Sequence, residues 1–233
     1  MSTAEERDQW KQAAAMAAMA HIAPGMWLGL GSGSTVAHII RALAQRLHGG
    51  LALAGVVTAS SESEHLAAQL GIPLTTLDAQ PTLDLALDGA DEVDQHLSLI
   101  KGGGGAHARE RVVIAAAQRF ILVADESKLV SRLGTTFPLP VEVLPFARTP
   151  VRLHLERMGL AVTLRERDGQ PYHTDNGNLI YDCRFATGID DASRWAVTLR
   201  AIPGVVDTGL FIGTTQHAII AGANGIRTLG AMA

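Results

Sequence analysis

The sequence predicts an α/β protein with a mostly parallel, Rossmann-like sheet, helices on both faces of that sheet, and a smaller inserted α+β domain. Two observations support this class. Between residues 26 and 124, short apolar runs of strand length alternate with longer segments of helical periodicity. From about Gly134, prolines punctuate extended segments and hairpin turns appear, so a second kind of unit begins there.

The composition is that of a globular protein. Of its residues, 47% are hydrophobic and 18% are charged. The length of 233 residues is enough for one large domain or for a main domain with an insert. The net charge of −4 argues against nucleic acid as a partner, because a nucleic-acid-binding face would be basic. No apolar run approaches the ~20 residues of a membrane span. A single cysteine, Cys183, and an N-terminal stretch too acidic for a signal peptide lead us to expect a cytoplasmic protein.

The first part of the chain is expected to contain a helix followed by strand–helix units. Thr3 and Glu6 have the spacing of a capping box, ahead of an alanine-rich helix that ends near Pro24. The elements expected after it are a strand over 26–30, a helix over 36–47, a strand over 56–60, a helix capped by Ser61 and Glu64, strand-like segments over 74–77 and 83–87, and a strand over 120–124.

The segment Gly31–Thr35 joins a predicted strand to a predicted helix. Its amides and hydroxyls would lie at the positive end of that helix and suit a phosphate, although an ordinary turn with a serine cap explains the residues equally well. The segment lacks the lysine of a nucleotide P-loop and does not complete the dinucleotide fingerprint. The ligand expected here is therefore a small phosphate ester, held by Ser32, Gly33, Ser34 and Thr35.

An acidic cluster follows the strand-like segment over 83–87. Clustered carboxylates suit a divalent metal, but no histidine or further acid recurs at a spacing that would complete a cage, so we expect no metal. Asp88 and Asp91, with Gly89 and Ala90 between them, are better suited to bind sugar hydroxyls and to move protons.

Four neighbouring polar residues have ordinary structural explanations. Glu92 and Asp94 are expected to face solvent. His96 and His107 are expected to be surface histidines or hydrogen-bonded structural ones.

A second short apolar run, over 97–100, leads into Lys101 and four consecutive glycines, Gly102 to Gly105. Such a loop brings backbone N–H groups close to an anion, because no Cβ stands in the way. After it the pattern becomes helical, and the expected inward face of that helix is formed by Val112, Val113, Ala116 and Ala117. Glu110 lies in the first turn. Because open α/β sheets place ligands at loops that follow strands, these groups together predict acid–base chemistry on a small polar substrate.

The segment from Gly134 predicts the smaller α+β domain. Thr149 and Pro150 have the character of an N-cap and a first helical residue. The remaining expected elements are a helix to 158, a strand over 160–166, a turn at 168–169, a strand over 179–184, a helix over 191–201, strands over 205–211 and 217–221, and a hairpin turn at 224–225.

Taken in order along the chain, these motifs closely resemble those of ribose-5-phosphate isomerase of the A type. The resemblance is carried by Gly-Ser-Gly-Ser-Thr, Asp-Gly-Ala-Asp-Glu, Lys-Gly-Gly-Gly and the glutamate nine residues after that lysine. It extends over the segments 124–128, 137–143, 174–178 and 202–206, and so covers nearly the whole chain.

The resemblance implies an aldose–ketose isomerase of the non-oxidative pentose phosphate pathway, which interconverts D-ribose 5-phosphate and D-ribulose 5-phosphate without a cofactor. It also implies a homodimer or a homotetramer. The implied domains are a catalytic domain over 1–133 and 206–233, and a ferredoxin-like α+β domain over 134–205 that forms one wall of the cleft.

In the implied mechanism, Glu110 carries a proton between C2 and C1 of the sugar through a cis-enediolate. Lys101 and the amides of Gly102, Gly103 and Gly104 are candidates to hold the enediolate charge, and such donors are worth on the order of 3 kcal/mol each.

The resemblance assigns the remaining roles in substrate binding. It implies ring opening by Asp88 and hydroxyl binding by Asp91. It aligns Lys11, which would otherwise be a solvated surface lysine, with a lysine that helps to hold the phosphate. It also favours Lys128 as a substrate-binding residue.

Two other classes of function are compatible with the residues. One is a different sugar-phosphate enzyme on a similar scaffold, such as an amino-sugar-phosphate deaminase or a CoA transferase. The other is a non-enzymatic sugar-phosphate sensor. Two positions also depart from the family pattern: Gly105 stands where many relatives have alanine, which would loosen the glycine loop, and His107 is less usual at its position.

Overall fold

The computed structural model describes residues 2–230, which fall into two compact units. Unit 1 contains the chain up to Ala90, Arg109–Lys128, and the chain from Thr214 onward; unit 2 contains Asp91–Ala108 and Leu129–Gly213. This division assigns 91–108 to unit 2, whereas the sequence-based division kept that segment with the catalytic domain. The physical reason is strand pairing, because two short strands within 91–108 pair with each other and with a strand near residue 210.

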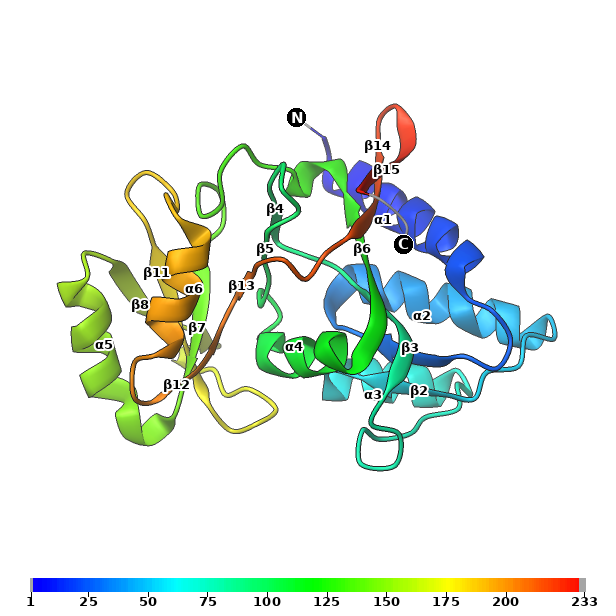
Figure 1. Cartoon of the computed structure of the whole chain (residues 1–233), viewed down its shortest axis with the longest axis horizontal. Coiled ribbons are helices and arrows are strands. Elements are labelled where there is room, and N and C mark those ends of the chain that lie inside the picture. Colours follow the sequence, from blue (N-terminus) through cyan, green and yellow to red (C-terminus); the bar gives the residue numbers. More distant parts are fainter. Residues whose placement is uncertain (1, 231–233) are drawn as a thin grey trace. The chain divides into compact units, whose positions relative to one another are not determined.

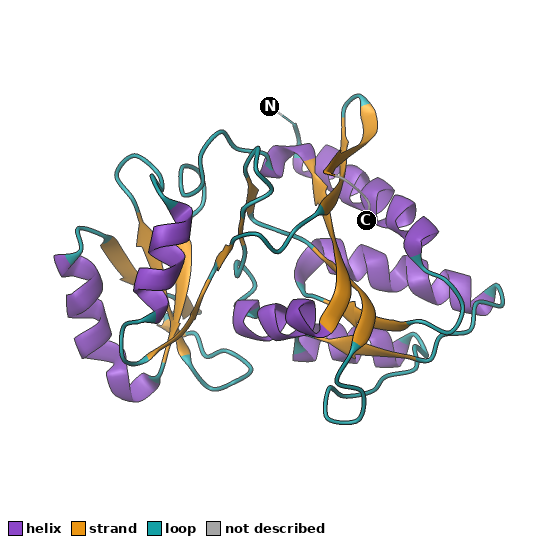
Figure 2. Ribbon diagram, in the orientation of Figure 1, coloured by secondary structure: helices purple, strands orange, loops and turns teal. Residues whose placement is uncertain are grey.

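Unit 1 is built on one six-stranded sheet (Figures 1 and 2). The sheet order is β15-β14-β6-β3-β1-β2, and every neighbouring pair is parallel except the β14–β15 hairpin. The mostly parallel α/β class predicted from the sequence is therefore confirmed. The strands are β1 (Trp27–Leu30), β2 (Gly55–Thr58), β3 (Leu83–Asp88), β6 (Ala117–Asp125), β14 (His217–Gly222) and β15 (Gly225–Gly230).

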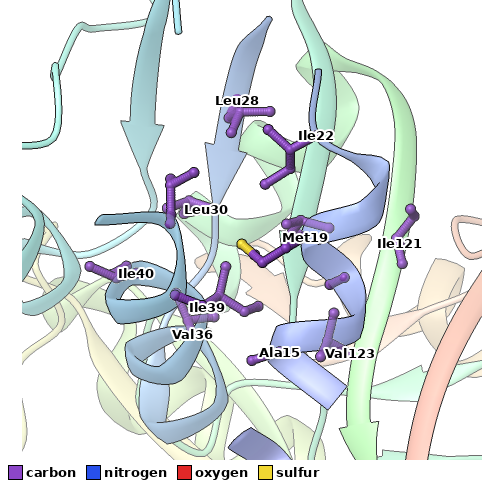
Figure 3. Packing of buried hydrophobic residues seen from close by; sticks show 14 of the residues in the cluster. Ala15, Met19, Ile22, Leu28, Leu30, Val36, Ile39, Ile40, Ile121 and Val123 are labelled. Carbon is purple, nitrogen blue, oxygen red and sulfur yellow. The ribbon is translucent and has the colours of Figure 1, made fainter. Parts of the chain in front are cut away.

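Helices cover both faces of this sheet. On one face, Leu28 and Leu30 of β1 pack into a buried cluster with α1 and α2, in which Met19 and Ile39 also take part (Figure 3). On the other face, Gly29 lies so close to α4 that a Cβ there would be 2.5 Å from Val113. The helical segments of unit 1 are α1 (Ala4–Ala18), η1 (Met19–His21), α2 (Gly33–His48), α3 (Ser61–Gln69), η2 (Glu126–Lys128) and α4 (His107–Ala116), whose first two residues belong to unit 2.

Of the two helix caps predicted in unit 1, one is confirmed and one was wrong. The capping box of α1 is confirmed, because Glu6 N–H donates to Thr3 Oγ1 at 3.1 Å and Thr3 N–H donates to Glu6 Oε2 at 2.7 Å. The predicted cap of α3 was wrong by one residue. Ser60 caps that helix by accepting from Ser63 N–H at 3.1 Å, so Ser61 is the first helical residue.

Two further expectations in unit 1 were wrong. Val112 is 56% exposed, whereas Val113 and Ile114 are buried. The buried pair lies one residue later than predicted, and because adjacent helical residues point about 100° apart, the inward face of α4 is turned by about that angle. Ala117 starts β6 instead of ending the helix. In the segment 74–77, which was expected to be strand-like, Leu74 forms an isolated bridge with Val56.

Unit 2 contains a four-stranded antiparallel sheet in the order β12-β7-β11-β8, together with two helices. Its core is formed by Val141 and Tyr181 from the sheet and by Leu155 and Leu199 from the helices. This arrangement has the α+β character that the sequence predicted. The elements are β7 (Leu139–Val143), η3 (Pro145–Ala147), α5 (Arg148–Arg157), β8 (Ala161–Leu164), β11 (Leu179–Arg184), α6 (Ala192–Arg200) and β12 (Val205–Thr208).

Two smaller sheets complete unit 2. The predicted turn at 168–169 joins an antiparallel hairpin. A three-stranded sheet contains the short strand that leads into the four glycines, together with one strand before it and one strand from much later in the chain. These strands are β9 (Glu166–Arg167) and β10 (Gln170–Pro171) in the hairpin, and β4 (Glu92–Val93), β5 (Leu99–Ile100) and β13 (Leu210–Phe211) in the three-stranded sheet.

The predicted start of α5 was also wrong. Thr149 and Pro150 are the second and third residues of the helix, and the N-cap position is Ala147. The reason is that Pro145 starts the 3-10 turn η3, which runs directly into α5. Pro150 is tolerated there because N–H groups in the first turn have no partner within the helix.

The one cysteine provides a chemical test of the unit 2 core. Cys183 is fully buried on β11, and burial raises the pKa of its thiol from 9.0 to about 12. We expect the folded protein not to react with a thiol reagent at pH 8, and to react rapidly once urea unfolds it. Since the folded thiol ionises later than the unfolded one, its contribution to stability is intact below pH 9 and is lost as the pH rises toward 12. Fast labelling of the folded protein would contradict the packing described here.

Candidate active site

The loop of residues 31–35 follows β1 and leads into α2, as the sequence predicted. Ser32 occupies the N-cap position of α2 but its hydroxyl does not cap the helix. Instead, Ser32 Oγ donates to Glu110 Oε1 at 2.5 Å, which is the length of a strong, charge-assisted hydrogen bond. Lys11 reaches the same loop from α1, and its Nζ donates to Ser34 Oγ at 3.0 Å. The positive end of α2, two hydroxyls and an ammonium group therefore meet at one loop.

Asp88 lies at the end of β3, directly beside this loop. Its side chain is 2% exposed, and its Oδ1 accepts from Gly89 N–H at 2.7 Å and from Ser32 N–H at 3.4 Å. Gly31 makes room for the carboxylate, because a Cβ at residue 31 would be 1.8 Å from Asp88 Cγ. The Gly31 glycine is thus required by the close approach of a charged side chain.

Glu110 is the second buried carboxylate of unit 1. It lies in the first turn of α4 and is 3% exposed. Ser32 contacts both acids, since its N–H donates to Asp88 and its hydroxyl to Glu110. The structure therefore brings together the loop, Asp88 and Glu110, which the sequence had singled out from three separate segments.

Lys128 ends the short helix η2 that follows β6, and it is half-buried. The last residue of β6, the fully buried Asp125, accepts from Ser127 N–H at 3.0 Å and also from the Ser127 hydroxyl. Of the two lysines predicted to bind the substrate, Lys11 contacts the loop of residues 31–35 directly. The role of Lys128 stays a prediction.

In unit 2, Lys101 and Asp91 flank the glycine loop, which we define as residues 102–105. Lys101 is 2% exposed, its backbone N–H donates to Gly209 O at 2.9 Å, and its Nζ lies 5.7 Å from the centre of the Phe211 ring. Asp91 Oδ2 accepts from Gly103 N–H at 2.7 Å. The ammonium group, one aspartate and the glycine amides predicted from the sequence are thus held together within this unit.

Two buried residues lie behind the glycine loop: His107, which the sequence analysis expected to be a surface or a structural histidine, and Glu142, which it did not single out. His107, which is fully buried, lies against the backbone of Gly102, and its Nε2 is 3.9 Å from Glu142 Oε2. Glu142 Oε1 accepts from Thr174 Oγ1 at 2.9 Å and from Asn178 Nδ2 at 2.8 Å. The available signal was the pair of motifs at 137–143 and 174–178, which the sequence analysis noted without giving them a role.

The expectation that Glu92 faces solvent was wrong. Glu92 is fully buried, and its carboxylate accepts from the backbone N–H groups of Gly134 at 2.5 Å, Thr136 at 2.7 Å and Phe137 at 2.7 Å. The Thr136 hydroxyl adds a fourth bond at 2.6 Å. Four donors replace the water that the charge loses on burial, which makes Glu92 a structural anchor for the segment 134–137.

Residues 2–230 contain neither a membrane-crossing helix nor a metal-binding cluster of side chains. No helix in that range is long and apolar enough to cross a membrane. The same range contains no group of three or more His, Cys, Asp or Glu side chains arranged to hold a metal ion.

Comparison with known proteins identifies the family. The family model described as ribose 5-phosphate isomerase A (phosphoriboisomerase A) matches residues 55–225. The chain belongs to this family. Its curated relatives include the ribose-5-phosphate isomerase A of Rhizobium meliloti, 48% identical over 229 residues, covering 96% of this chain and 98% of the relative. The enzyme of the same name from Roseiflexus sp. is 50% identical over 225 residues, covering 95% and 96% of the two chains.

Solved structures of the ribose 5-phosphate isomerase A family have the same fold. The ribose 5-phosphate isomerase A of Methanocaldococcus jannaschii superimposes with a TM-score of 0.91 at 41% identity, covering 96% of this chain and 99% of that one. A D-ribose-5-phosphate isomerase solved in complex with phospho-erythronic acid gives a TM-score of 0.93 at 36% identity, with coverage of 97% and 99%.

The buried anchor Glu92 provides a stability test. Replacing Glu92 by alanine removes a fully buried carboxylate and leaves the N–H groups of Gly134, Thr136 and Phe137 without their acceptor, so we expect a loss of about 3 kcal/mol in the free energy of unfolding. Urea denaturation measures this loss. Glu166→Ala, at an exposed glutamate of the same unit, is the matched control and should change the stability by less than about 0.5 kcal/mol. Equal stabilities of the two variants would contradict the buried role of Glu92.

Proposed function

We propose that this protein interconverts D-ribose 5-phosphate and D-ribulose 5-phosphate through a cis-enediolate, with Glu110 as the general base. Membership of the ribose 5-phosphate isomerase A family supports the reaction. The observation that carries the residue assignment is the bond between Ser32 Oγ and Glu110 Oε1, because it holds a buried carboxylate next to a loop suited to phosphate.

The reaction needs a base that serves two adjacent carbons. A proton leaves C2, whose acidity comes from the neighbouring carbonyl group, and returns at C1. One carboxylate between the two carbons performs both steps. Ser32 fixes Oε1 of Glu110, which restricts the direction in which the carboxylate acts. Such positioning contributes strongly to catalysis, because the base and the carbon that it deprotonates are already held together and the entropy cost of aligning them is lower.

Ring opening precedes enolisation and needs a second proton-transfer group. In the closed sugar, a proton must move between the anomeric hydroxyl and the ring oxygen. We assign this step to Asp88, because its buried carboxylate is oriented by two backbone amides at the end of β3. Asp91, held by Gly103 N–H, is assigned to a sugar hydroxyl.

The enediolate places negative charge on oxygen, and a cation must stabilise it. Lys101 is suited to this role, because its ammonium group is almost completely buried and acts where water screens little. The glycine amides that follow it add preorganised dipoles. Of these, the Gly103 amide is engaged by Asp91, so Gly103 orients a substrate-binding acid.

The phosphate group is assigned to the loop of residues 31–35. Amides at the start of α2 and the Ser34 hydroxyl face an anion there, and Lys11 supplies a positive charge through its contact with Ser34. Binding energy gained at the phosphate, which does not react, holds the sugar in place for the chemical steps.

Two properties beyond the reaction also belong to the proposal. Family resemblance supports a homodimer or a homotetramer in solution. A single buried cysteine suits the reducing conditions of the cytoplasm, where we propose that the protein acts.

The central test of the function is the variant Glu110→Gln. It keeps the shape and the hydrogen bonding of the side chain but removes the base, so we expect kcat to fall by about 10³-fold or more. The KM for ribose 5-phosphate should change little. A coupled assay for ribulose 5-phosphate measures both constants.

Glu64→Gln, at an exposed glutamate on α3, is the matched control and should be as active as the unchanged protein. In heavy water, the active protein should introduce deuterium at a carbon of the product, because the transferred proton exchanges with solvent. A nearly normal rate in Glu110→Gln would remove Glu110 from the mechanism, and product without deuterium would favour a hydride shift.

The phosphate assignment makes a different prediction. Lys11→Ala should raise the KM by about tenfold and leave kcat within about threefold, because the lysine binds the substrate and the transition state alike. Steady-state kinetics with ribose 5-phosphate measures this split. A large fall in kcat at unchanged KM would show that Lys11 acts on the reacting carbons instead.

A further inference from the structure

The glycine loop has a carbonyl side that is held by side chains of unit 2. Arg165 Nη1 donates to Gly102 O at 2.7 Å and to Gly103 O at 3.2 Å. The Tyr172 hydroxyl donates to Gly104 O at 3.0 Å. Three consecutive carbonyl groups are thus bound from outside the loop. These contacts restrict a glycine segment whose backbone would otherwise be flexible.

Peptide geometry fixes what the other side of the loop presents. In a planar trans peptide the C=O group of one residue and the N–H group of the next point in opposite directions, and the described chain contains no cis peptide bond. Because Gly102 O and Gly103 O point at Arg165, the N–H groups of Gly103 and Gly104 point away from it. The observed bond from Gly103 N–H to Asp91 confirms this direction.

The amide side of the loop is therefore the side of Asp91, a residue that we assign to the substrate. Gly104 is exposed, and its N–H group points to that same side. A single guanidinium group on the opposite side binds both carbonyl groups whose peptides carry the two amides. Gly102 O also accepts from Gly105 N–H at 3.0 Å, so Arg165 is the side chain that holds the Gly103–Gly104 peptide from this side.

Arg165 is itself held rigidly. Its Nε donates to Asp182 Oδ2 at 3.0 Å and its Nη2 donates to Asp182 Oδ1 at 2.5 Å, and both side chains are mostly buried. The Arg165 backbone N–H donates to Ile180 O at 2.8 Å, next to the paired strands β8 and β11. The guanidinium fork thus connects the loop to the antiparallel sheet.

Gly105, the glycine that departs from the family pattern, leaves room for Tyr172 beside the loop. It has a φ of +84°, and a Cβ there would be 2.5 Å from the Tyr172 ring and hydroxyl. Glycine at residue 105 lets the phenol pack against the loop and reach Gly104 O. Burial raises the pKa of Tyr172 above its ordinary value of 10.0, which is already well above neutral pH, and the hydroxyl is therefore a donor. Glycine at residue 105 is thus required by the close approach of Tyr172 to the loop.

We propose that Arg165, anchored by Asp182, is a positioning residue that turns the Gly104 amide toward the negative oxygen of the enediolate. This role rests on the proposed isomerase function. Lysine would not replace Arg165, because a single ammonium group cannot form the two-pronged contact with Asp182 and also bind two carbonyl oxygens. Arg165 does not touch the substrate in this scheme; it acts through the peptide groups of the loop.

The test separates transition-state stabilisation from substrate binding. The variants are Arg165→Ala and Arg165→Lys, and the matched control is Arg194→Ala, which removes an exposed arginine paired with Asp190 at 3.3 Å in the same unit. The readouts are kcat, the KM for ribose 5-phosphate, and the inhibition constant of phospho-erythronic acid. The carboxylate of that acid carries negative charge where the enediolate would carry it.

We expect kcat and the affinity for phospho-erythronic acid to fall together, each by about 10- to 100-fold, in both Arg165 variants. The KM should stay within about threefold of its normal value, and added guanidinium ion should restore part of the activity of Arg165→Ala. Arg194→Ala should behave like the unchanged protein. Asp182→Asn keeps the arginine while weakening its anchor, so it should show a smaller loss of the same kind even if Arg165→Ala folds poorly.

Two results would overturn the positioning role alone. One is an active protein in which Arg165→Ala matches Arg194→Ala in all three constants. The other is a KM that rises at unchanged kcat, which would make Arg165 an ordinary contributor to substrate binding. An unchanged protein without isomerase activity would overturn the proposed function, and the positioning role with it.

Discussion

A carboxylate can be buried only where N–H and O–H donors replace the water that it loses, and much of this structure follows from that requirement. Asp88 is held by two amides, Glu92 by three amides and a hydroxyl, and Glu110 by the Ser32 hydroxyl. Each of these acids accepts hydrogen bonds from residues of a loop, and these bonds fix the position of that loop. The loops that form the candidate active site are therefore shaped by charge compensation as much as by hydrophobic packing.

The two units contain different kinds of proposed catalytic groups. The carboxylates proposed to move protons, Asp88 and Glu110, belong to unit 1, whereas Lys101 and the glycine loop, which are proposed to hold the negative charge, belong to unit 2. The chain passes from one unit to the other inside both motifs, after Ala90 and after Ala108. Each motif therefore contributes residues to both units: the first contributes Asp88 and Asp91, and the second contributes Lys101 and Glu110.

The sequence predicted the parts of the site that local rules govern. The loop of residues 31–35, Asp88 and Lys101 each follow an apolar run of strand length, and ligands in α/β folds gather at such positions. Glu110 was singled out because it lies in the first turn of the helix expected after the glycines, and the family resemblance implied its role as the base. The class of the fold was predictable for the same reason, since strand and helix patterns are both short-range signals.

The parts that were missed depend on partners far away in the sequence. Glu92 was expected to be solvated because its donors come from residues 134–137, about 40 positions later. Arg165 had the appearance of an ordinary charged residue near a hairpin, and its loop contacts lie more than 60 positions earlier. The misplaced cap at Ser61 is different, because two adjacent serines compete for one role and only the backbone decides between them.

The orientation of the Ser32 hydroxyl has a consequence for how the protein would change under selection. An N-cap side chain that bonds to its own helix is worth about 1 kcal/mol, and α2 forgoes that gain because Ser32 turns toward Glu110. A search for heat-resistant variants that ignored turnover would thus favour residues at position 32 that cap α2. At position 32, the side chain that best stabilises α2 and the side chain orientation that serves Glu110 are therefore in conflict.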